Sequence, residues 1–313
     1  MSSLLHPTFI ATWRQMQPRA RREALEGYLG ISPWVIGFFF LTVGPMLVSV
    51  YFSLTQWDIV SVPKWVGLAN YRKLFTDDPL FYKALQVTFT YVVMAVPLKL
   101  IAGLGLSLLL NMKVRGMNVY RTLFYLPAVL SGVAVALMWI WIMHPEMGII
   151  NNFLANFGIE GPKWFWDPQT ALLSVVVMNL WYVGGSAVIY LAGLQNIPPH
   201  LYEAAEMDGA NHWWRFWSIT LPLLTPTLFL QLVTGLIEAF QVFTSVYIIT
   251  RGGPLHATYF YMLYLYEQAF QEFNMGYASA MAWVLTLIIV TCSVIVFRTS
   301  KSWVYYEDTE EAK

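Results

Sequence analysis

Residues 168–202 read PQTALLSVVVMNLWYVGGSAVIYLAGLQNIPPHLY and contain no Asp, Glu, Lys or Arg. A helix needs about 20 apolar residues to cross the hydrocarbon core of a bilayer, and this run is longer than that. The same absence of charge extends over three other long runs, at residues 27–57, 122–145 and 273–297. These four runs predict four membrane-spanning helices.

Two further apolar runs are each interrupted by a single charged residue. Lys99 is the only charge in residues 84–112, and Glu238 is the only charge in residues 216–250. Lipid offers backbone amides no hydrogen-bond partners, so spans of this length must be helical. We predict an all-α integral membrane protein with six transmembrane helices, at about residues 31–53, 86–111, 120–143, 170–194, 218–243 and 276–298.

The overall composition agrees with a protein that lies in a lipid bilayer. Of the 313 residues, 58% are hydrophobic and only 12% are charged, whereas soluble proteins carry about 25% charged residues. The formal net charge is zero, which argues against a nucleic-acid partner because such proteins carry basic patches.

The distribution of Lys and Arg predicts the orientation in the membrane. Six spans place both termini on the same side. The terminal segments, the turn at 112–119 with Arg121 at its edge, and the loop at 195–217 together carry eleven Lys and Arg, against six in the other connecting segments. Because the basic side faces the cytoplasm, we predict a cytoplasmic N-terminal segment (1–30), a six-span domain (31–298) and a cytoplasmic tail (299–313).

The loop between the fourth and fifth spans, residues 198–222, reads PPHLYEAAEMDGANHWWRFWSITLP. Pro199 favours the start of a helix, since a first-turn residue needs no amide partner. Gly209 favours its end, because glycine adopts a left-handed cap without steric cost. A second short helix from about Asn211 would lead into the fifth span at Pro222. We predict a cytoplasmic helix-turn-helix.

No pattern in the chain indicates an enzyme. The five histidines form no H-E-x-x-H pair, so no metal site is expected, and no glycine-rich loop ends in Lys-Ser or Lys-Thr as a nucleotide site would require. Gly184-Gly185-Ser186 lacks the flanking residues of a nucleophile elbow. Cys292 is the only cysteine and has no histidine near it in sequence.

Lys99 and Glu238 are predicted to lie at membrane depth. A lone charge there is costly, so it usually faces a partner, a cavity or water. One hypothesis is that Glu238, with Gln241 one helical step away, lines a polar translocation pathway. The alternative is that each charge reaches the membrane surface or pairs with a neighbouring subunit, and for Lys99 we favour this alternative.

Several polar and aromatic residues in the spans are further candidates for the pathway. Such side chains can hydrogen-bond to a solute or stack on a sugar ring. The alternative for each of them is ordinary hydrogen bonding and packing between helices. The candidates are Tyr182, Ser186, Ser279 and Trp283.

The loop at 198–222 resembles a known signature. Glu203-Ala204-Ala205, three residues, Gly209, nine residues and Ile219-x-Leu221-Pro222 are similar to the signature of bacterial ABC-importer permeases. Other segments resemble the carbohydrate-uptake branch of that family, the maltose-type first permease subunit. They are WVGLANY (65–71), YRTLFYLP (120–127), TRGGP (250–254) and GYASA (276–280).

This resemblance implies a function. In that family the signature loop forms a coupling helix that docks on a cytoplasmic ATPase, so the expected coupling residues are Glu203, Ala204, Ala205, Asp208, Gly209 and Pro222. The expected partners are a second homologous permease, two copies of the ATPase and an extracytoplasmic solute-binding protein. No cofactor is expected in this chain, while ATP and Mg²⁺ are expected in the ATPase. The expected location is the cytoplasmic (inner) membrane of a bacterium or archaeon.

The expected activity is ATP-driven import of a sugar, an oligosaccharide or glycoside, with this chain forming half of the pathway. Import of glycerol-phosphate or another polyol is the first alternative. A self-sufficient secondary transporter or channel is an alternative from another class, but it should show ion-coupling acids and paired broken helices from an internal repeat. A membrane-embedded hydrolase is a third, which the lack of paired acids and histidines in the spans disfavours.

Overall fold

The computed structural model describes residues 18–305. Arg14 and the ends of the two predicted terminal segments, at 1–17 and 306–313, lie outside the described residues. Within the described part, five helical runs are long and apolar enough to cross a membrane, in agreement with five of the predicted spans. They are Arg22–Ser53, Pro79–Leu110, Ala171–Gln195, His212–Ile249 and Met275–Ser300.

Three of the runs are not single α-helices. The first joins α2 (Pro18–Phe38), a π-helical turn (Phe39–Val43) and α3 (Gly44–Ser53), and the next is α5 (Pro79–Leu110) alone. The third run joins α9 (Ala171–Asn179), a 3-10 turn (Leu180–Tyr182) and α10 (Val183–Gln195). The fourth joins α12 (His212–Arg215), a π-helical turn (Phe216–Thr220), α13 (Leu221–Phe240) and α14 (Thr244–Ile249). The fifth is α16 (Met275–Ser300) alone.

The predicted third span consists of two helices, α6 (Met117–Val129) and α7 (Gly132–Ile142), which meet at 101°. The described chain reaches six spans only when this pair counts as one. Pro127 lies near the end of α6 and has no amide hydrogen to donate. Leu130 and Ser131 then adopt extended conformations, so the helical hydrogen bonding stops and the chain turns.

Short elements connect these helices. They are β1 (Thr55–Gln56), which pairs antiparallel with β2 (Lys64–Trp65); α4 (Ala69–Thr76); α8 (Ile149–Ala155); a 3-10 turn (Trp164–Trp166); α11 (Pro199–Met207); α15 (Tyr261–Tyr266); and a π-helical turn (Glu267–Gln271). The segment between the fifth and sixth spans, read from the sequence as a connecting loop, thus contains the helix α15.

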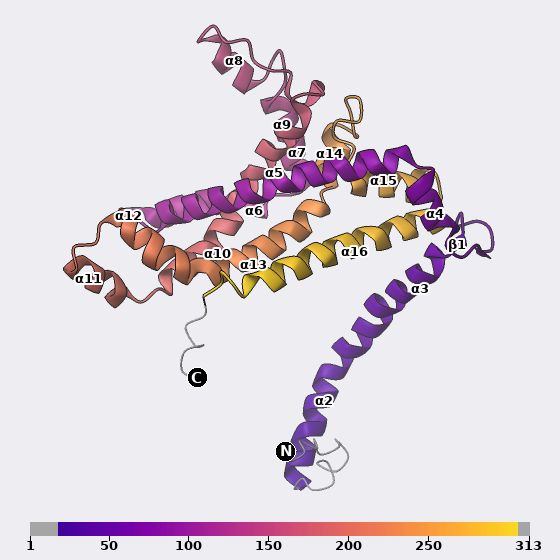
Figure 1. Cartoon of the computed structure of the whole chain (residues 1–313), viewed down its shortest axis with the longest axis horizontal. Coiled ribbons are helices and arrows are strands. Elements are labelled where there is room, and N and C mark those ends of the chain that lie inside the picture. The colour runs from indigo at the N-terminus through magenta and orange to yellow at the C-terminus, as the bar shows by residue number, and fades with distance from the viewer. Residues whose placement is uncertain (1–17, 306–313) are drawn as a thin grey trace.

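The long helices α5, α13 and α16 run beside one another, and α10 packs against both α5 and α13 (Figure 1). One end of this bundle carries α11 and α12, and the other carries α4 and β1 (Figure 1). We call these the α11 end and the α4 end. The helix α3 packs against α16, whereas α2 diverges from the bundle (Figure 1), and the most apolar part of the Arg22–Ser53 run has no buried residue.

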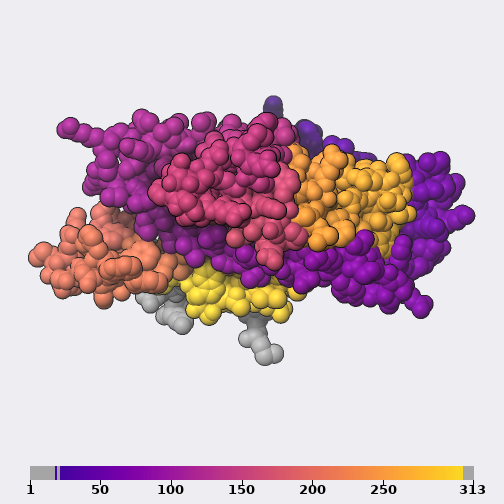
Figure 2. Space-filling view, turned by 90° about the horizontal axis from the view of Figure 1, so that it is seen from above, coloured from indigo at the N-terminus to yellow at the C-terminus, as the bar shows by residue number. Residues whose placement is uncertain are grey.

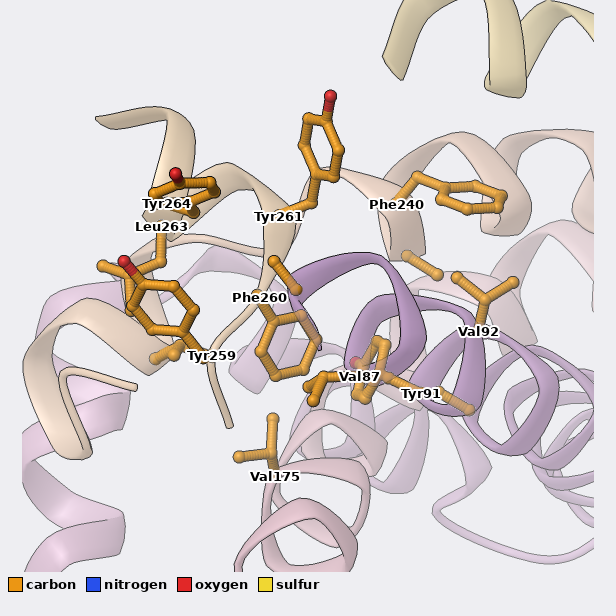
Figure 3. Close-up of a cluster of buried hydrophobic side chains, with 14 of the residues drawn as sticks. Val87, Tyr91, Val92, Val175, Phe240, Tyr259, Phe260, Tyr261, Leu263 and Tyr264 are labelled. Atoms are coloured by element: carbon orange, nitrogen blue, oxygen red, sulfur yellow. The ribbon is translucent and has the colours of Figure 1, made fainter. Parts of the chain in front are cut away.

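The largest core cluster lies where α5 meets α9, α13 and α15. Figure 3 shows Val87 and Tyr91 of α5 close to Phe260, with Val175 of α9 on the other side. The rings of Tyr91 and Phe260 meet edge to face with their centroids 5.0 Å apart, an arrangement that aromatic quadrupoles favour. This packing fixes the bundle around one face of α5.

Candidate functional site

The helix α11 forms as the sequence predicts. Pro198 is extended, as a residue before proline prefers, and Pro199 opens the helix. At its other end Gly209 has a φ of +78°, and the amide of Ala210 donates to the carbonyl of Ala205 at 2.9 Å. A Cβ on Gly209 would meet nothing within 4 Å. Its backbone conformation, rather than lack of space, therefore requires glycine here.

The residues of the signature divide between two faces of α11. Ala205 is buried, and Leu201 beside it packs against a cluster formed by Tyr190, Ile197 and Leu224. The residues that remain exposed are Glu203, Ala204, Asp208 and Gly209. In the space-filling view the segment around α11 forms a separate lobe at one end of the molecule (Figure 2). Glu206 is exposed as well, so the chain presents three acids and small residues on a projecting helix.

The second short helix, α12, is confirmed as well. Asn211 caps it, because its side-chain oxygen accepts a hydrogen bond from the amide of Trp214 at 2.8 Å. The chain then passes through the π-helical turn into α13, whose first turn contains the half-buried Pro222. The helix-turn-helix is therefore continuous with the fifth long helix.

A second candidate site is a cavity of about 160 Å³ in the middle of the bundle. Its walls come from α5, α9, the 3-10 turn after α9, and α13. The residues that line it are Tyr91, Ala95, Val96, Lys99, Val176, Asn179, Leu180, Tyr182, Gly235, Glu238, Ala239 and Val242. Most of the wall is apolar, and the polar groups are two phenols, one amide and two opposite charges.

The two charges pair with each other. Lys99 Nζ lies 2.6 Å from Glu238 Oε2, and the side chains are 30% and 66% exposed, respectively. Because each charge offsets the other, neither stands alone among apolar helices. The partner of each residue is therefore in the same chain, rather than in a neighbouring subunit or at the membrane surface as the alternative supposed.

The structure brings only some of the predicted pathway residues together. Tyr182 and Glu238 line the cavity, and the exposed Gln241 lies just past the end of α13. Ser186 is buried, and its carbonyl accepts a hydrogen bond from Gln231 at 3.2 Å. The remaining two are elsewhere: Ser279 is half-buried on α16, and Trp283 donates to Ser49 of α3 at 3.1 Å.

Most of the lining residues were not chosen from the sequence, among them the polar residues Lys99 and Tyr91. Lys99 was assigned to the membrane surface or another subunit, and Tyr91 was not singled out. A signal for Lys99 was present, since two lone and opposite charges in different spans are most simply neutralised by each other. Tyr91 gave no such signal, because a tyrosine in an apolar helix resembles any core aromatic residue.

The cavity offers groups that can bind a polar solute. Among residues 18–305, no group of three or more His, Cys, Asp and Glu is placed to hold a metal ion. The phenols, the amide of Asn179 and the ion pair can donate and accept hydrogen bonds, and the aromatic faces can stack on a sugar ring. The arrangement suits reversible binding.

These features define a class: a multi-pass helical membrane protein with a polar cavity inside the bundle and a projecting helix at one end. Residues 78–301 match the family described as binding-protein-dependent transport system inner membrane component. The chain belongs to that family. The family resemblance seen in its sequence is confirmed.

Relatives cover most of the chain. It is 47% identical over 295 residues to the probable ABC transporter permease protein YesP of Bacillus subtilis (strain 168), covering 93% of this chain and 95% of the relative. It is 33% identical over 282 residues to the trehalose/maltose transport system permease protein MalF of Thermococcus litoralis, covering 88% and 93%, respectively.

A solved structure shares the fold. It is the crystal structure of a bacterial ABC transporter involved in the import of the acidic polysaccharide alginate, and one of its chains aligns with a TM-score of 0.80 at 23% identity. The alignment covers 90% of this chain and 97% of that chain.

Proposed function

We propose that this protein is the permease subunit of an ATP-driven ABC importer for a sugar, in which α11 is the coupling helix and the cavity is part of the translocation pathway. The observation that supports this proposal most directly is the exposed signature helix α11 at one end of the bundle. It gives a chain of this family a surface on which an ATPase can bind and transmit its conformational change. Glu203 and Asp208 can pair with basic groups of an ATPase, and Ala204 allows close approach.

A sugar is the solute class that several of the relatives with a named solute support. Their names include trehalose/maltose, lactose and starch degradation products. An sn-glycerol-3-phosphate permease is also related, at 31% identity over 290 residues, which keeps a polyol phosphate as the second candidate. The paired charges of Lys99 and Glu238 leave the cavity without net charge from these two residues, and this suits a neutral sugar.

The orientation and the partners belong to the same proposal. The α11 end faces the cytoplasm of a bacterium or archaeon, where two copies of an ATPase supply energy from ATP and Mg²⁺. The backbone amide of Tyr305 donates to Thr225 near the start of α13 at 2.9 Å, so the described C-terminal end lies at that same end. An extracytoplasmic binding protein delivers the solute at the α4 end, and a structure related to this chain holds such a periplasmic protein.

A second permease completes the pathway. The described chain leaves the apolar middle of the first span exposed, including Phe39, Phe40 and Leu41 with exposed fractions of 58%, 74% and 81%. A homologous permease would cover part of this surface. We take the cavity as one half of the pathway, and the 66% exposure of the Glu238 side chain leaves room for a second subunit to contact it.

The test is uptake by the importer reconstituted in vesicles with its ATPase, second permease and binding protein. Replacing Glu203 with Lys, or Gly209 with Val, should greatly reduce uptake while the permease still inserts in the membrane. Val is strained at a φ of +78°. Glu160 is exposed and lies outside the loop at 198–222, so Glu160→Gln is the matched control and should transport normally. Normal uptake and normal ATPase assembly in both loop variants would overturn the assignment of α11.

A further inference from the structure

The connection between α11 and α13 departs from regular α-helix at two points. The first is the turn at Gly209, where φ is positive and no neighbouring atom would lie within 4 Å of a Cβ, so no packing contact supports the turn at this point. The second is the π-helical turn Phe216–Thr220, which interrupts regular α-helical hydrogen bonding. A force applied to α11 could be absorbed at either point before it reached the long helix.

Two side-chain contacts cross this connection. Glu206 Oε1 lies 2.5 Å from Arg215 Nη1, and the Arg215 side chain is only 13% exposed. The hydroxyl of Tyr202 lies 2.9 Å from the hydroxyl of Thr220, which is buried. Each contact joins α11 to the segment that leads into α13.

The spacing of these four residues explains why both contacts form. Tyr202 and Glu206 are four apart, so they lie on the same face of α11. Arg215 and Thr220 are five apart, which would place them on different faces of a regular α-helix. The turn between them is π-helical, with i→i+5 hydrogen bonds, so it is wound more loosely than an α-helix and brings the two side chains closer to one face. The two pairs therefore match in antiparallel order, 202 with 220 and 206 with 215.

We propose that Glu206, Arg215, Tyr202 and Thr220 are positioning residues that make α11 and the start of α13 move as one body. We call this set the bracket. The bracket transmits a displacement of α11 to α13, the helix that carries Glu238 into the cavity. Without it, bending at Gly209 would absorb the displacement. This inference rests on the proposed function, since it assumes that α11 receives the motion of an ATPase.

The competing explanation is that the contacts only stabilise the loop. Glu206 is 63% exposed, although the Arg215 side chain is only 13% exposed. Because solvent reaches the carboxylate side of the pair, we expect the ion pair to contribute little to stability. The two explanations therefore predict different things. A bracket changes how much solute moves for each ATP hydrolysed, whereas a stabilising contact changes the unfolding temperature and affects transport and ATP hydrolysis together.

The experiment measures solute uptake per ATP hydrolysed in the reconstituted importer, for Glu206→Gln and Arg215→Gln. Each variant should lower that ratio by about twofold to thirtyfold, the range that single residues give to coupling between sites, with an unchanged unfolding temperature. Glu23→Gln is the matched control, because it breaks the exposed Arg19–Glu23 pair on α2 and should leave the ratio unchanged.

Exchange of the two charges gives the decisive comparison. The double variant Glu206→Arg with Arg215→Glu restores opposite charges across the turn and should recover most of the lost ratio. Tyr202→Phe and Thr220→Val remove the second contact with little change in shape, and each should lower the ratio further in the Glu206→Gln background. A normal ratio in the single-charge variants, or no recovery in the exchanged double variant, would overturn the bracket.

The Glu203→Lys variant separates this inference from the proposed function. If Glu203→Lys abolishes uptake while the bracket variants transport with a normal ratio, then α11 couples to the ATPase and the bracket alone is wrong. If Glu203→Lys and the bracket variants all transport normally, then α11 is not the coupling helix and both proposals fail.

Discussion

Two carboxylates in the bundle, Asp78 at the α4 end and Glu238 in the cavity, are held very differently. Asp78 is 7% exposed and caps α5. It accepts hydrogen bonds from the amide of Phe81 at 3.1 Å, from the hydroxyl of Tyr264 at 2.5 Å and from the hydroxyl of Tyr277. Glu238 is 66% exposed, and within residues 18–305 its charge is met by Lys99 alone.

The difference in burial and hydrogen bonding distinguishes a carboxylate that stabilises the fold from one that is free to contact a solute. A buried carboxylate is stable only when its oxygens are satisfied, and the three donors around Asp78 achieve this. Those donors come from α5, α15 and α16, so Asp78 fastens three elements together. Glu238 keeps accepting capacity toward an open cavity, which is what a residue needs if it contacts a passing solute.

The largest effect should follow from removing the structural carboxylate. Asp78→Ala leaves two phenol hydroxyls without their acceptor and removes the cap of α5. We expect the free energy of unfolding to fall by about 3 kcal/mol, the combined cost of unpaired buried groups and a lost cap. Thermal or denaturant unfolding of the purified protein in detergent measures it.

The neighbouring residue provides the control. Asp77 is exposed, so Asp77→Ala should change the free energy of unfolding by less than about 0.5 kcal/mol, as surface substitutions usually do. Equal losses in the two variants would show that the local charge matters and that the hydrogen bonds of Asp78 do not.

A smaller effect should follow from removing one donor. Tyr277→Phe keeps the ring, over which Lys73 Nζ lies 4.7 Å from the centroid, but deletes the hydroxyl that Asp78 accepts from. Because Tyr264 and the amide of Phe81 remain, we expect a loss of about 1 kcal/mol. A loss as large as that of Asp78→Ala would mean that Tyr277 alone supports the carboxylate.

The sequence carries a signal only for the local half of the Asp78 site, and our prediction of the second span, which began at about residue 86, did not use it. An Asp directly before Pro79 is a signal for a helix cap followed by a proline in the first turn. Tyr264 and Tyr277, however, lie 186 and 199 residues away along the chain. No local pattern tells which of the many tyrosines in apolar segments will meet Asp78.

The two candidate functional sites differ in the same way: one depends on local sequence, and the other depends on residues far apart in the chain. The elements of the loop at 198–222 depend on Pro199, Gly209 and Asn211. Each of these residues acts on the backbone within three residues of itself, so the positions of the elements can be predicted. The cavity depends on Lys99 and Glu238, which are 139 residues apart. The pairing of α5 with α13 that joins them comes from packing along two apolar helices whose sequences offer many equivalent registers.

The smallest effect on stability, with a large effect on transport, should come from Glu238→Gln. Glutamine keeps the shape and can still accept a hydrogen bond from Lys99, and the pair is partly exposed to solvent. We therefore expect the free energy of unfolding to change by less than about 1 kcal/mol. Lys99 would then leave an uncompensated positive charge in the cavity, and uptake should fall by about tenfold, equivalent to 1.4 kcal/mol.

The matched variant removes both charges. Lys99→Met combined with Glu238→Met returns the contribution of this pair to the net charge of the cavity to zero. The double variant should therefore transport better than Glu238→Gln, although a sugar would lose two hydrogen-bonding partners. Uptake by Glu238→Gln equal to that of the unmodified importer would place the pair outside the pathway. Glu238 would then resemble Asp78, a charge that holds two helices together, and the contrast between the two carboxylates would reduce to their exposure.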